Sequence, residues 1–397
     1  MAGPAFKFNR SEVSGSLGDL GTLVPLAVGL VAVNHVDASV ILLTVGLFYI
    51  ALGLYYRLPI PVQPFKVFAA VAIAQGLAKE TLSAGALIMA AILLFIGATN
   101  LISVIARLFS KPVIRGIQAG LGLTLLLKGV SFILGDKVFV TDFTPALAQH
   151  FPLNLALGIA AFLAALMLIN NRRLPAAIAL VAGGLIVSLA LGAHMAVPAW
   201  NMGMHLPRIA VPGAGHWWPA LILLALPQLP LTIGNAVIGT RDTSEKLFGQ
   251  EHCACVTDRA LCFSMGASNI MFGLLGGMPC CHGAGGLAAH YRFGARTGGS
   301  NIIIGAILVI LALAFGPSAM SLLTLIPAPV LGVLLFFAGA ELALMLVDLS
   351  DRTSLFIAIS VAGIALGTRN MGIAFASGIV IEQIISRLGI SFEQAKK

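Results

Sequence analysis

The sequence predicts an all-α membrane protein with about fourteen transmembrane segments, arranged as two inverted seven-segment repeats. Three observations support this prediction. The chain of 397 residues is 59% hydrophobic and 10% charged, with a mean hydropathy of +1.01, whereas roughly a quarter of the residues in soluble domains are charged. Its apolar residues form a long series of stretches suited to a membrane. Finally, proline-rich motifs recur at a nearly constant offset in the two halves of the chain.

The apolar stretches define the expected helices. Several are long enough to cross the roughly 30 Å of hydrocarbon in a bilayer. The third and tenth are interrupted by prolines, and a helix from Pro64 to Gln75 would span only about 18 Å. We therefore expect half-helices at these two places. The fourteen stretches are 16–33, 40–56, 60–75, 81–105, 112–134, 152–169, 175–194, 217–240, 256–276, 279–291, 300–316, 321–347, 354–367 and 371–387.

The basic residues indicate how these segments are oriented. If the N-terminus is cytoplasmic and the segments alternate, 17 of the 23 lysines and arginines lie on the cytoplasmic side and 5 on the other, and Lys66 remains inside the membrane. Cytoplasmic loops normally carry such an excess. The bias predicts an even number of segments and cytoplasmic termini, in a plasma (inner) membrane of bacterial type. It also accounts for the net charge of +8 without a nucleic-acid partner.

An internal repeat relates the two halves of the chain. Pro61 and Pro279 are 218 residues apart, and Pro112 and Pro329 are 217 apart. We place repeat one at about 12–195 and repeat two at about 215–390. Because seven segments per repeat is an odd number, the second repeat enters the membrane from the opposite side. Inverted repeats of this kind are typical of secondary transporters, which bind substrate where broken helices meet near the membrane midplane.

Several other functions are disfavoured by what the sequence contains. It has no G-x-x-x-x-G-K-[ST] motif, which excludes ATP hydrolysis in this chain, and its first residues do not resemble a signal peptide. Two faint metal patterns, His252 with two nearby cysteines and the run "CCH" at 280–282, lack the second ligand pair that zinc requires. We expect no metal, no cofactor, no disulfide framework and no enzymatic activity. The five cysteines are at 253, 255, 262, 280 and 281.

The stretch "IPVQPFKVF" at 60–68 predicts half of an anion site. Residues before a proline favour extended backbone, and proline suits the first position of a helix. We therefore expect an extended segment, Gln63 as the helix cap and Pro64 as the helix start. The counterpart "MPCCHGAGG" predicts a second helix start near His282–Gly283. Two helix N-termini at the midplane attract anions, and glycines there let a ligand approach the backbone.

Polar side chains in and near these helices extend the candidate site. Lys66 has three interpretations: contact with the anion, an ion pair with Asp19, or extension of its charge to the membrane interface. Gln228, Thr232 and Asn235 on the eighth segment either donate to an oxyanion or join helices through hydrogen bonds. The candidate substrate-binding residues are Gln63, Pro64, Lys66, Gln228, Thr232, Asn235, Cys281, His282, Gly283, Ala284 and Gly285.

Asp19 and His282 are the candidates for proton coupling or ion pairing. A histidine can change its charge near neutral pH and so couple proton entry to transport. A histidine that is merely hydrogen-bonded within the protein is the alternative. Glu341 and Glu382 carry less information, because they can lie at helix ends or at a subunit contact.

Four stretches resemble signature sequences of a known family. They are "SLGDLGTLVPL", "PIPVQPFKVFAAVA", "PQLPLTIGNAVIGT" and "GGMPCCHGAGGLAAHYRFGARTG". They are similar to those of the molybdate transporter family of plants, algae and prokaryotes, a branch of the sulfate permease superfamily. The combination of P-V-Q-P-x-K with P-x-C-H-G-x-G-G-L-A is specific. The resemblance runs from the first segment through the tenth and more weakly to the end.

This resemblance implies an architecture and a mechanism. The single transmembrane domain, 1–397, would divide into a core (about 12–106 and 217–316) and a gate (about 107–195 and 320–390). Substrate would lie between segments 3 and 10, beside segments 1 and 8. An elevator-like movement of core against gate would give alternating access. We expect no regulatory domain of the kind that sulfate permeases carry, so a homodimer would form through the gate helices, surrounded by membrane lipid.

The expected function is secondary active transport of a tetrahedral oxyanion, with molybdate as the first choice and a proton or another ion as the coupling partner. Sulfate transport or anion exchange is the alternative, since sulfate and molybdate are tetrahedral dianions of similar shape. A nucleobase permease of the same fold is disfavoured because 226–240 and 279–291 contain no Asp or Glu. The sequence does not separate a carrier from an anion channel.

Overall fold

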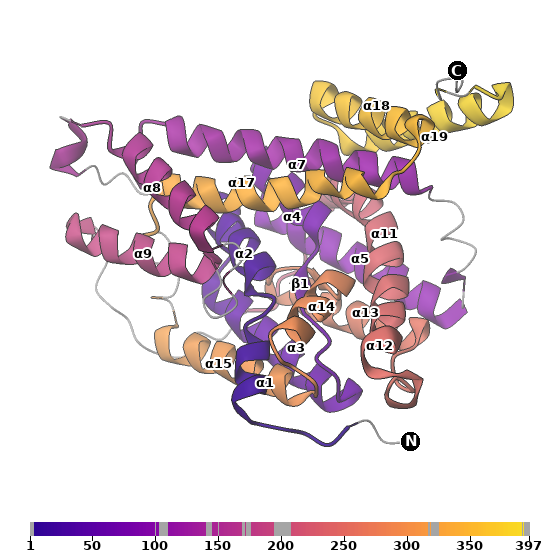
Figure 1. Cartoon of the computed structure of the whole chain (residues 1–397), viewed down its shortest axis with the longest axis horizontal. Helices are drawn as coiled ribbons and strands as arrows, with labels where there is room; N and C mark the ends of the chain where they lie inside the picture. Colours follow the sequence, from indigo (N-terminus) through magenta and orange to yellow (C-terminus); the bar gives the residue numbers. More distant parts are fainter. Residues whose placement is uncertain are drawn as a thin grey trace.

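The computed structural model describes residues 4–99, 101–102, 110–139, 145–149, 151–168, 171, 176–193, 208–316, 318, 325–390 and 392. Almost every regular element is helical (Figure 1). In chain order the elements are α1 (Arg10–Ser16), α2 (Leu20–Asn34), α3 (Ala38–Tyr56), β1 (Gln63–Pro64), α4 (Lys66–Gln75), α5 (Lys79–Thr99), α7 (Lys111–Leu134), η1 (Ala146–Gln149), α8 (Leu153–Leu168), α9 (Ala176–Ala190), η3 (Ala214–His216), α10 (Trp217–Pro219), η4 (Ala220–Ala225), α11 (Leu226–Leu231), η5 (Thr232–Gly239), α12 (Thr240–Phe248), η6 (Gln250–His252), α13 (Asp258–Leu275), β2 (Cys280–Cys281), α14 (Ala284–Arg292), α15 (Gly299–Phe315), α17 (Ala328–Leu344), η7 (Met345–Asp348), α18 (Arg352–Thr368) and α19 (Met371–Leu388).

The helices follow the predicted stretches closely, with one informative exception. The eighth segment contains Pro227 and Pro230, and a proline suits the start of a helix better than its interior. Instead the chain is helical without a break from Trp217 to Phe248, and the two prolines lie within α11. The turns on either side of them, η4 and η5, are π-helical. Proline removes a backbone donor, and such wider turns are a common way for a helix to continue around a local disruption. Parts of the predicted segments 81–105 and 321–347 lie outside the described residues.

Helix packing confirms the two inverted repeats. Helix α3 (segment 2, first repeat) packs on α15 (segment 11, second repeat). In the same way, α13 (segment 9, second repeat) packs on α5 (segment 4, first repeat), so the same pair of contacts occurs with the repeats exchanged. The fifth and twelfth segments, α7 and α17, run side by side (Figure 1). Gly122 and Gly339, 217 residues apart, face each other in this pair. Each glycine lies against the other's carbonyl oxygen, and such small residues let membrane helices approach closely.

The helix lengths suit a membrane with two half-helices. In the part of the chain that the structure describes, seven helices are long and apolar enough to cross a membrane by length and composition. Shorter apolar helices accompany them, and α4 is one of these. Its ten residues span about 15 Å, which is half of the hydrocarbon thickness. The exposed large hydrophobic side chains on the outer helices are consistent with this setting.

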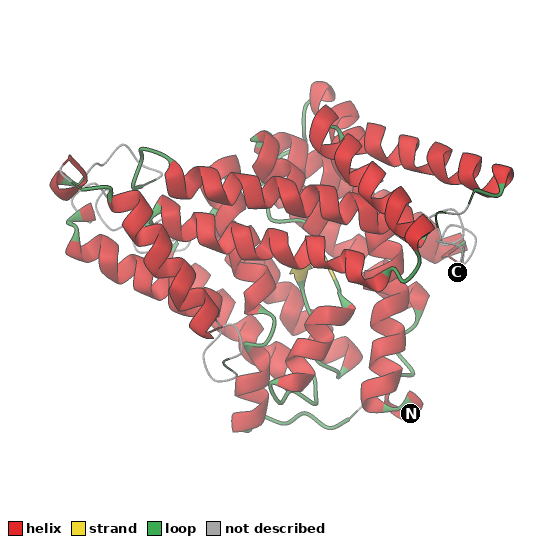
Figure 2. Ribbon diagram, turned by 45° about the horizontal axis from the view of Figure 1, so that its top comes forward, coloured by secondary structure: helices red, strands yellow, loops and turns green. Residues whose placement is uncertain are grey.

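The two half-helix segments cross at the centre of the molecule as a short antiparallel pair of strands (Figure 2). Gln63 pairs with Cys281, and Pro64 pairs with Cys280. Backbone in this position must find partners within the protein. Neighbouring helices supply them: Tyr49 Oη donates to the carbonyl of Val62 at 3.2 Å.

Two asparagines hold the same crossing from the second repeat. Asn301 Nδ2 donates to the carbonyl of Ile60 at 2.7 Å. Asn269 binds both sides of one residue, because its Nδ2 donates to the Cys280 carbonyl at 2.7 Å and its Oδ1 accepts from the Cys280 N–H at 3.1 Å. All four of these residues are buried. The crossing is therefore fixed rigidly, and it sets the positions at which α4 and α14 begin.

Candidate anion-binding site

The first half-helix begins two residues later than predicted. Helix α4 starts at Lys66, and its cap is Phe65, without a side-chain hydrogen bond. The prediction that Gln63 caps a helix starting at Pro64 is therefore wrong. Strand pairing explains the difference, because Gln63 and Pro64 are held by β2 and the N–H of Phe65 donates to the carbonyl of Pro279 at 3.0 Å. The helix can begin only after these backbone groups are satisfied.

A neutral amide from the second repeat closes part of the α4 N-terminus. The Oε1 atom of Gln228 accepts from the N–H of Phe68, the third residue of the helix, at 3.1 Å. The Nε2 atom of Gln228 donates to Thr232 Oγ1 at 3.0 Å. Gln228 and Thr232 are both fully buried. Their polar atoms are thus used within the protein, which corresponds to the helix-joining interpretation of these two residues.

The N-terminus of the second half-helix has no side-chain cap. Helix α14 begins at Ala284, and its cap, Gly283, provides no side chain. A Cβ atom on Gly286 would lie 2.7 Å from Asp19 Oδ2 and also too close to the amide of Gln63. Only glycine fits there. Around Gly285, by contrast, a Cβ atom would meet nothing within 4 Å, so one face of this helix start is open.

Asp19 and Gln63 meet beside this helix start. The Nε2 atom of Gln63 donates to Asp19 Oδ1 at 2.6 Å. The second carboxylate oxygen of Asp19 and the Oε1 atom of Gln63 are buried and have no hydrogen-bond partner among the described residues. An unpaired buried acceptor is unfavourable. The pair therefore leaves two hydrogen-bond acceptors unused beside the free N–H groups at the start of α14.

Lys66 does not pair with Asp19. Across the described ranges, Lys66 makes no hydrogen bond and no ion pair, so no direct contact joins it to Asp19 in this structure. Its half-buried side chain lies in the first turn of α4, where a cation is unfavourable next to the positive end of the helix dipole. A cation in this position gains a favourable interaction when an anion is present.

A cavity of about 400 Å³ connects these features. It lies between α2, β1, α4 and α14 on one side and α8, α9 and α17 on the other, and Lys66, Gln63 and Gly285 contribute to its wall. The exposed carboxylate of Glu341 lies on the opposite wall. The remaining lining residues are Gly18, Gly21, Thr22, Pro25, Leu26, Ala165, Leu168, Asn171, Ala176, Ala177, Leu180, Phe293, Leu334, Phe337, Ala338, Leu342 and Met345.

Most of this wall could not be recognised in the sequence. Thr22 is the exception, since it follows Asp19 by three residues and so lies on the same side of a helix. Phe293 and Phe337 carry no such signal. Apolar residues that line a cavity and those that face lipid have the same hydropathy, and only the packing of helices distinguishes them.

His282 lies away from this cavity. Its Nδ1 atom is 3.1 Å from the carbonyl of Pro61, its Nε2 atom is 2.8 Å from Ser264 Oγ, and its ring stacks on Phe48. Because a carbonyl only accepts, Nδ1 carries the hydrogen in this arrangement. The side chain is fully buried. This placement corresponds to the structural alternative for His282 and gives it no contact with either of the cavities described here.

The other predicted residues occupy three kinds of position. Cys281 is buried, with its Sγ atom 3.9 Å from the carbonyl of Pro64 in the strand pair. Gly283 and Ala284 form the start of α14. Asn235 lies on the wall of a second cavity, described below. Within the described residues, no three His, Cys, Asp or Glu side chains are grouped as a metal site would require.

Comparison with known proteins identifies the family. Residues 11–125 and 220–342 match the family model described as "Molybdate transporter of MFS superfamily". The chain belongs to the molybdate transporter family. It is 32% identical to Molybdate transporter 2 of Arabidopsis thaliana over 94% of this chain and 86% of that one. It is also 32% identical to Molybdate transporter 1 of Chlamydomonas reinhardtii, over 93% of this chain and 90% of that one.

More distant similarity links this member of the molybdate transporter family to other anion carriers. A probable sulfate transporter of Mycobacterium tuberculosis is 26% identical, over 76% of this chain and 55% of that one. Among solved structures, the transmembrane domain of the cyanobacterial bicarbonate transporter BicA has a TM-score of 0.68 at 17% identity, covering 96% of this chain and 98% of that one. Murine SLC26A9 has a TM-score of 0.62 at 17% identity, covering 98% and 70%. These two structures establish the fold of fourteen segments in two inverted halves.

Proposed function

We propose that this protein is a secondary active transporter of a tetrahedral oxyanion, with molybdate as its substrate. Membership of the molybdate transporter family supports the substrate class. The observation that carries the proposal is the position of Lys66, a cation without a partner among the described residues, on the wall of a cavity that also contains the open N-terminus of α14. A dianion bound between them would interact with both the ammonium group and the free N–H groups of the helix.

The proposed coupling partner is a proton carried by Asp19. Its Oδ2 atom is buried without a partner beside Gly286, close to the proposed anion position. Two negative charges in one poorly solvated site repel each other. Protonation of Asp19 removes this repulsion and turns an unused acceptor into a hydrogen-bond donor. Binding of a dianion and of a proton would therefore favour each other.

The proposed transport movement is of the elevator type. The cavity lies between elements of the predicted core (α2, β1, α4 and α14) and elements of the predicted gate (α8, α9 and α17). A rigid movement of the core past the gate would carry the site from one side of the membrane to the other. We further propose a homodimer formed through the gate helices, surrounded by lipid, with both termini in the cytoplasm of a bacterial-type cell.

Uptake into proteoliposomes tests the proposal. Purified full-length protein should accumulate radiolabelled molybdate when an inward proton gradient is imposed, and unlabelled tungstate and sulfate should be compared as competitors at two pH values. Saturable uptake that is inhibited most strongly by molybdate and tungstate supports the proposal. Sulfate as the preferred competitor would instead favour the sulfate alternative, which the mycobacterial relative's name also suggests. Absence of saturable uptake of all three anions would contradict both.

A further inference from the structure

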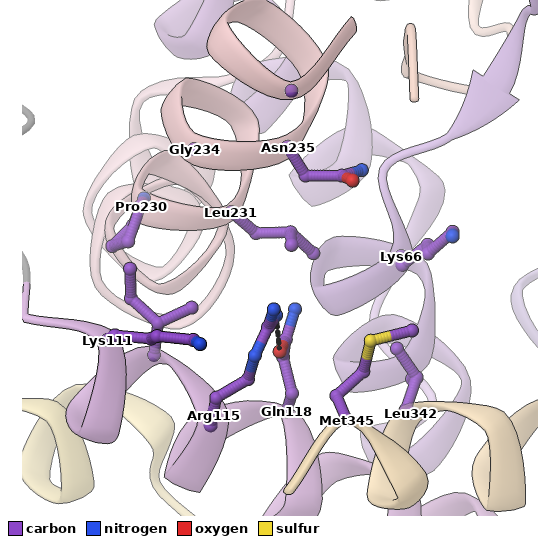
Figure 3. Close-up of a pocket in the computed structure, with 12 residues that line it drawn as sticks. Lys66, Lys111, Arg115, Gln118, Pro230, Leu231, Gly234, Asn235, Leu342 and Met345 are labelled. Atoms are coloured by element: carbon purple, nitrogen blue, oxygen red, sulfur yellow. Dashed lines mark hydrogen bonds between the residues drawn. The ribbon is translucent and has the colours of Figure 1, made fainter. Parts of the chain in front are cut away.

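A second cavity, separate from the one at α14, lies against α7. Its volume is about 410 Å³, and it is enclosed by α7, α11, η5 and the start of α4 (Figure 3). Lys66, Leu342 and Met345 line both cavities, so these three residues mark the place where the two spaces adjoin. Any ligand in the second cavity would thus be next to Lys66 without occupying the α14 helix start.

Nitrogen donors dominate the polar groups of this second cavity. Lys111 and Arg115 are four residues apart on α7 and therefore lie on one face of that helix. The Arg115 Nη1 atom donates to Gln118 Oε1 at 2.8 Å, and Arg115 Nε is buried without a partner in the described part of the chain. The ends of Lys111, Arg115 and Gln118 converge from one side, and Asn235 approaches from the other (Figure 3).

Two of these amides have unused donors. Gln118 is only 2% exposed, and its Nε2 group makes no hydrogen bond within the described ranges. The Asn235 side chain also has no partner there. Among the residues that the structure describes, no Asp or Glu lines the cavity. Asp348, which is about half exposed, forms an ion pair with Arg115, and its carbonyl accepts from Lys111 Nζ at 2.8 Å.

We propose that this cavity is a second oxyanion site that holds an anion before or after it occupies the site at α14. Arginine and lysine donors with two unused amides suit an oxyanion, because guanidinium groups bind such oxygens in pairs. The absence of lining carboxylates makes the cavity unsuitable for a cation. Positively lined clefts raise the local concentration of anions, and Lys66 would then contact the anion in either space. This inference rests on the proposed function.

Binding of molybdate to purified full-length protein tests the second site. In equilibrium dialysis at low ionic strength, the wild type should bind two molybdate ions per chain, with different affinities. Added salt should weaken the second class more strongly, because its charges are partly exposed. The double variant Lys111→Gln/Arg115→Gln should lose about tenfold or more in affinity at the second class and keep the first. Lys128→Gln, on the same helix but over the Phe132 ring, is the matched control and should keep both.

A third variant acts in the opposite direction. Asp348→Asn removes the acid that competes for Arg115, and it should tighten the second class about threefold. Loss of folding cannot mimic this gain. If the double variant does not fold, Lys111→Gln alone, which leaves the Arg115–Asp348 pair intact, must weaken the second class at least about threefold. The second site alone is overturned if the wild type binds one molybdate per chain, or if the variants keep two classes of binding with unchanged affinities. No molybdate binding by the wild type overturns the proposed function as well.

Discussion

The two half-helices begin in equivalent places of the two repeats, but different kinds of side chain meet their N-termini. At the third residue of α4, the N–H of Phe68 is bound by Gln228 from the eighth segment. At the third residue of α14, Gly286 lies against Asp19 from the first segment. Each helix start is therefore met by a side chain from the opposite repeat. One is a neutral amide with all its polar atoms engaged, and the other is an acid with one oxygen unpaired.

In the proposed site, this difference separates a helix end that packs within the protein from a helix end that binds the anion. Gln228 occupies one N–H group of the α4 end, and the first residue of that helix, Lys66, contributes a positive charge. The α14 end contributes backbone N–H groups and an open face at Gly285. Backbone symmetry places both helix dipoles at the centre, and side chains then make the site asymmetric. An asymmetric site can bind an anion between a cation on one side and a titratable acid on the other.

The largest expected effect is that of removing the Lys66 charge. A hydrogen bond to a charged group contributes about 1.5–3 kcal/mol, so Lys66→Gln should lower kcat/KM for molybdate uptake by about 10- to 150-fold. Lys66→Arg, which keeps the charge, should retain more activity than Lys66→Gln. Initial uptake rates into proteoliposomes measure this effect.

Lys79→Gln is the matched control for Lys66. Lys79 is the next lysine along the chain and is exposed at the start of α5. Its substitution should leave uptake unchanged. Equal uptake by Lys66→Gln and Lys79→Gln would mean that the α4 end contributes no charge to the substrate site.

Two neighbouring glycines on α14 should respond differently to added side chains. Gly285→Val would extend into open space, so it should lower molybdate affinity about tenfold or more while the melting temperature stays the same. Gly286→Ala would press on Asp19 and Gln63, so it should cost about 1–3 kcal/mol of stability as overpacking does. Thermal unfolding and dialysis binding on both variants measure the contrast. If both lose stability equally, the face at Gly285 is not open.

The titratable carboxyl group of Asp19 predicts that uptake depends on pH, whereas the neutral amide of Gln228 predicts no such dependence. A negative charge beside the α14 start opposes dianion binding, so uptake by the wild type should rise as pH falls and Asp19 becomes neutral. Asp19→Asn keeps an oxygen that can accept from Gln63 but removes the charge. Its uptake should vary no more than about twofold across the pH range in which the wild type changes several-fold. A wild-type pH profile preserved in Asp19→Asn would exclude Asp19 as the proton carrier.

The sequence was sufficient for the architecture because membranes restrict backbone structure so strongly. Hydropathy located the helices, and the Pro61–Pro279 offset identified the repeat. The exact helix starts were wrong by two residues at α4, since the strand pair of Gln63 with Cys281 is a contact between residues over 200 positions apart. Local proline rules contain no information about such a pairing.

The candidate site was predictable only in part, for a related reason. Lys66 and Gly285, which the sequence predicts to bind substrate, both lie on the cavity wall. His282 is polar and lies in the same motif, but its ring points to Pro61 and Ser264. Sequence shows that a buried polar group needs a partner, but it does not show whether that partner is protein or ligand. Arg115 carries no sequence signal of a ligand site, because the cavity that it lines forms between elements of the two repeats.

The smallest expected effect concerns the closed end of α4. Thr232→Val removes an acceptor from Gln228 Nε2 and should cost about 1 kcal/mol of stability. Gln228→Leu removes the acceptor of the Phe68 N–H as well and should cost more, up to about 3 kcal/mol. Denaturation in detergent measures both. Neither should change the molybdate affinity of the folded protein by more than about twofold, because the Phe68 N–H already has a protein partner. A substantial loss of affinity without loss of stability would show instead that the α4 end opens to the substrate, and that the two half-helices are functionally equivalent after all.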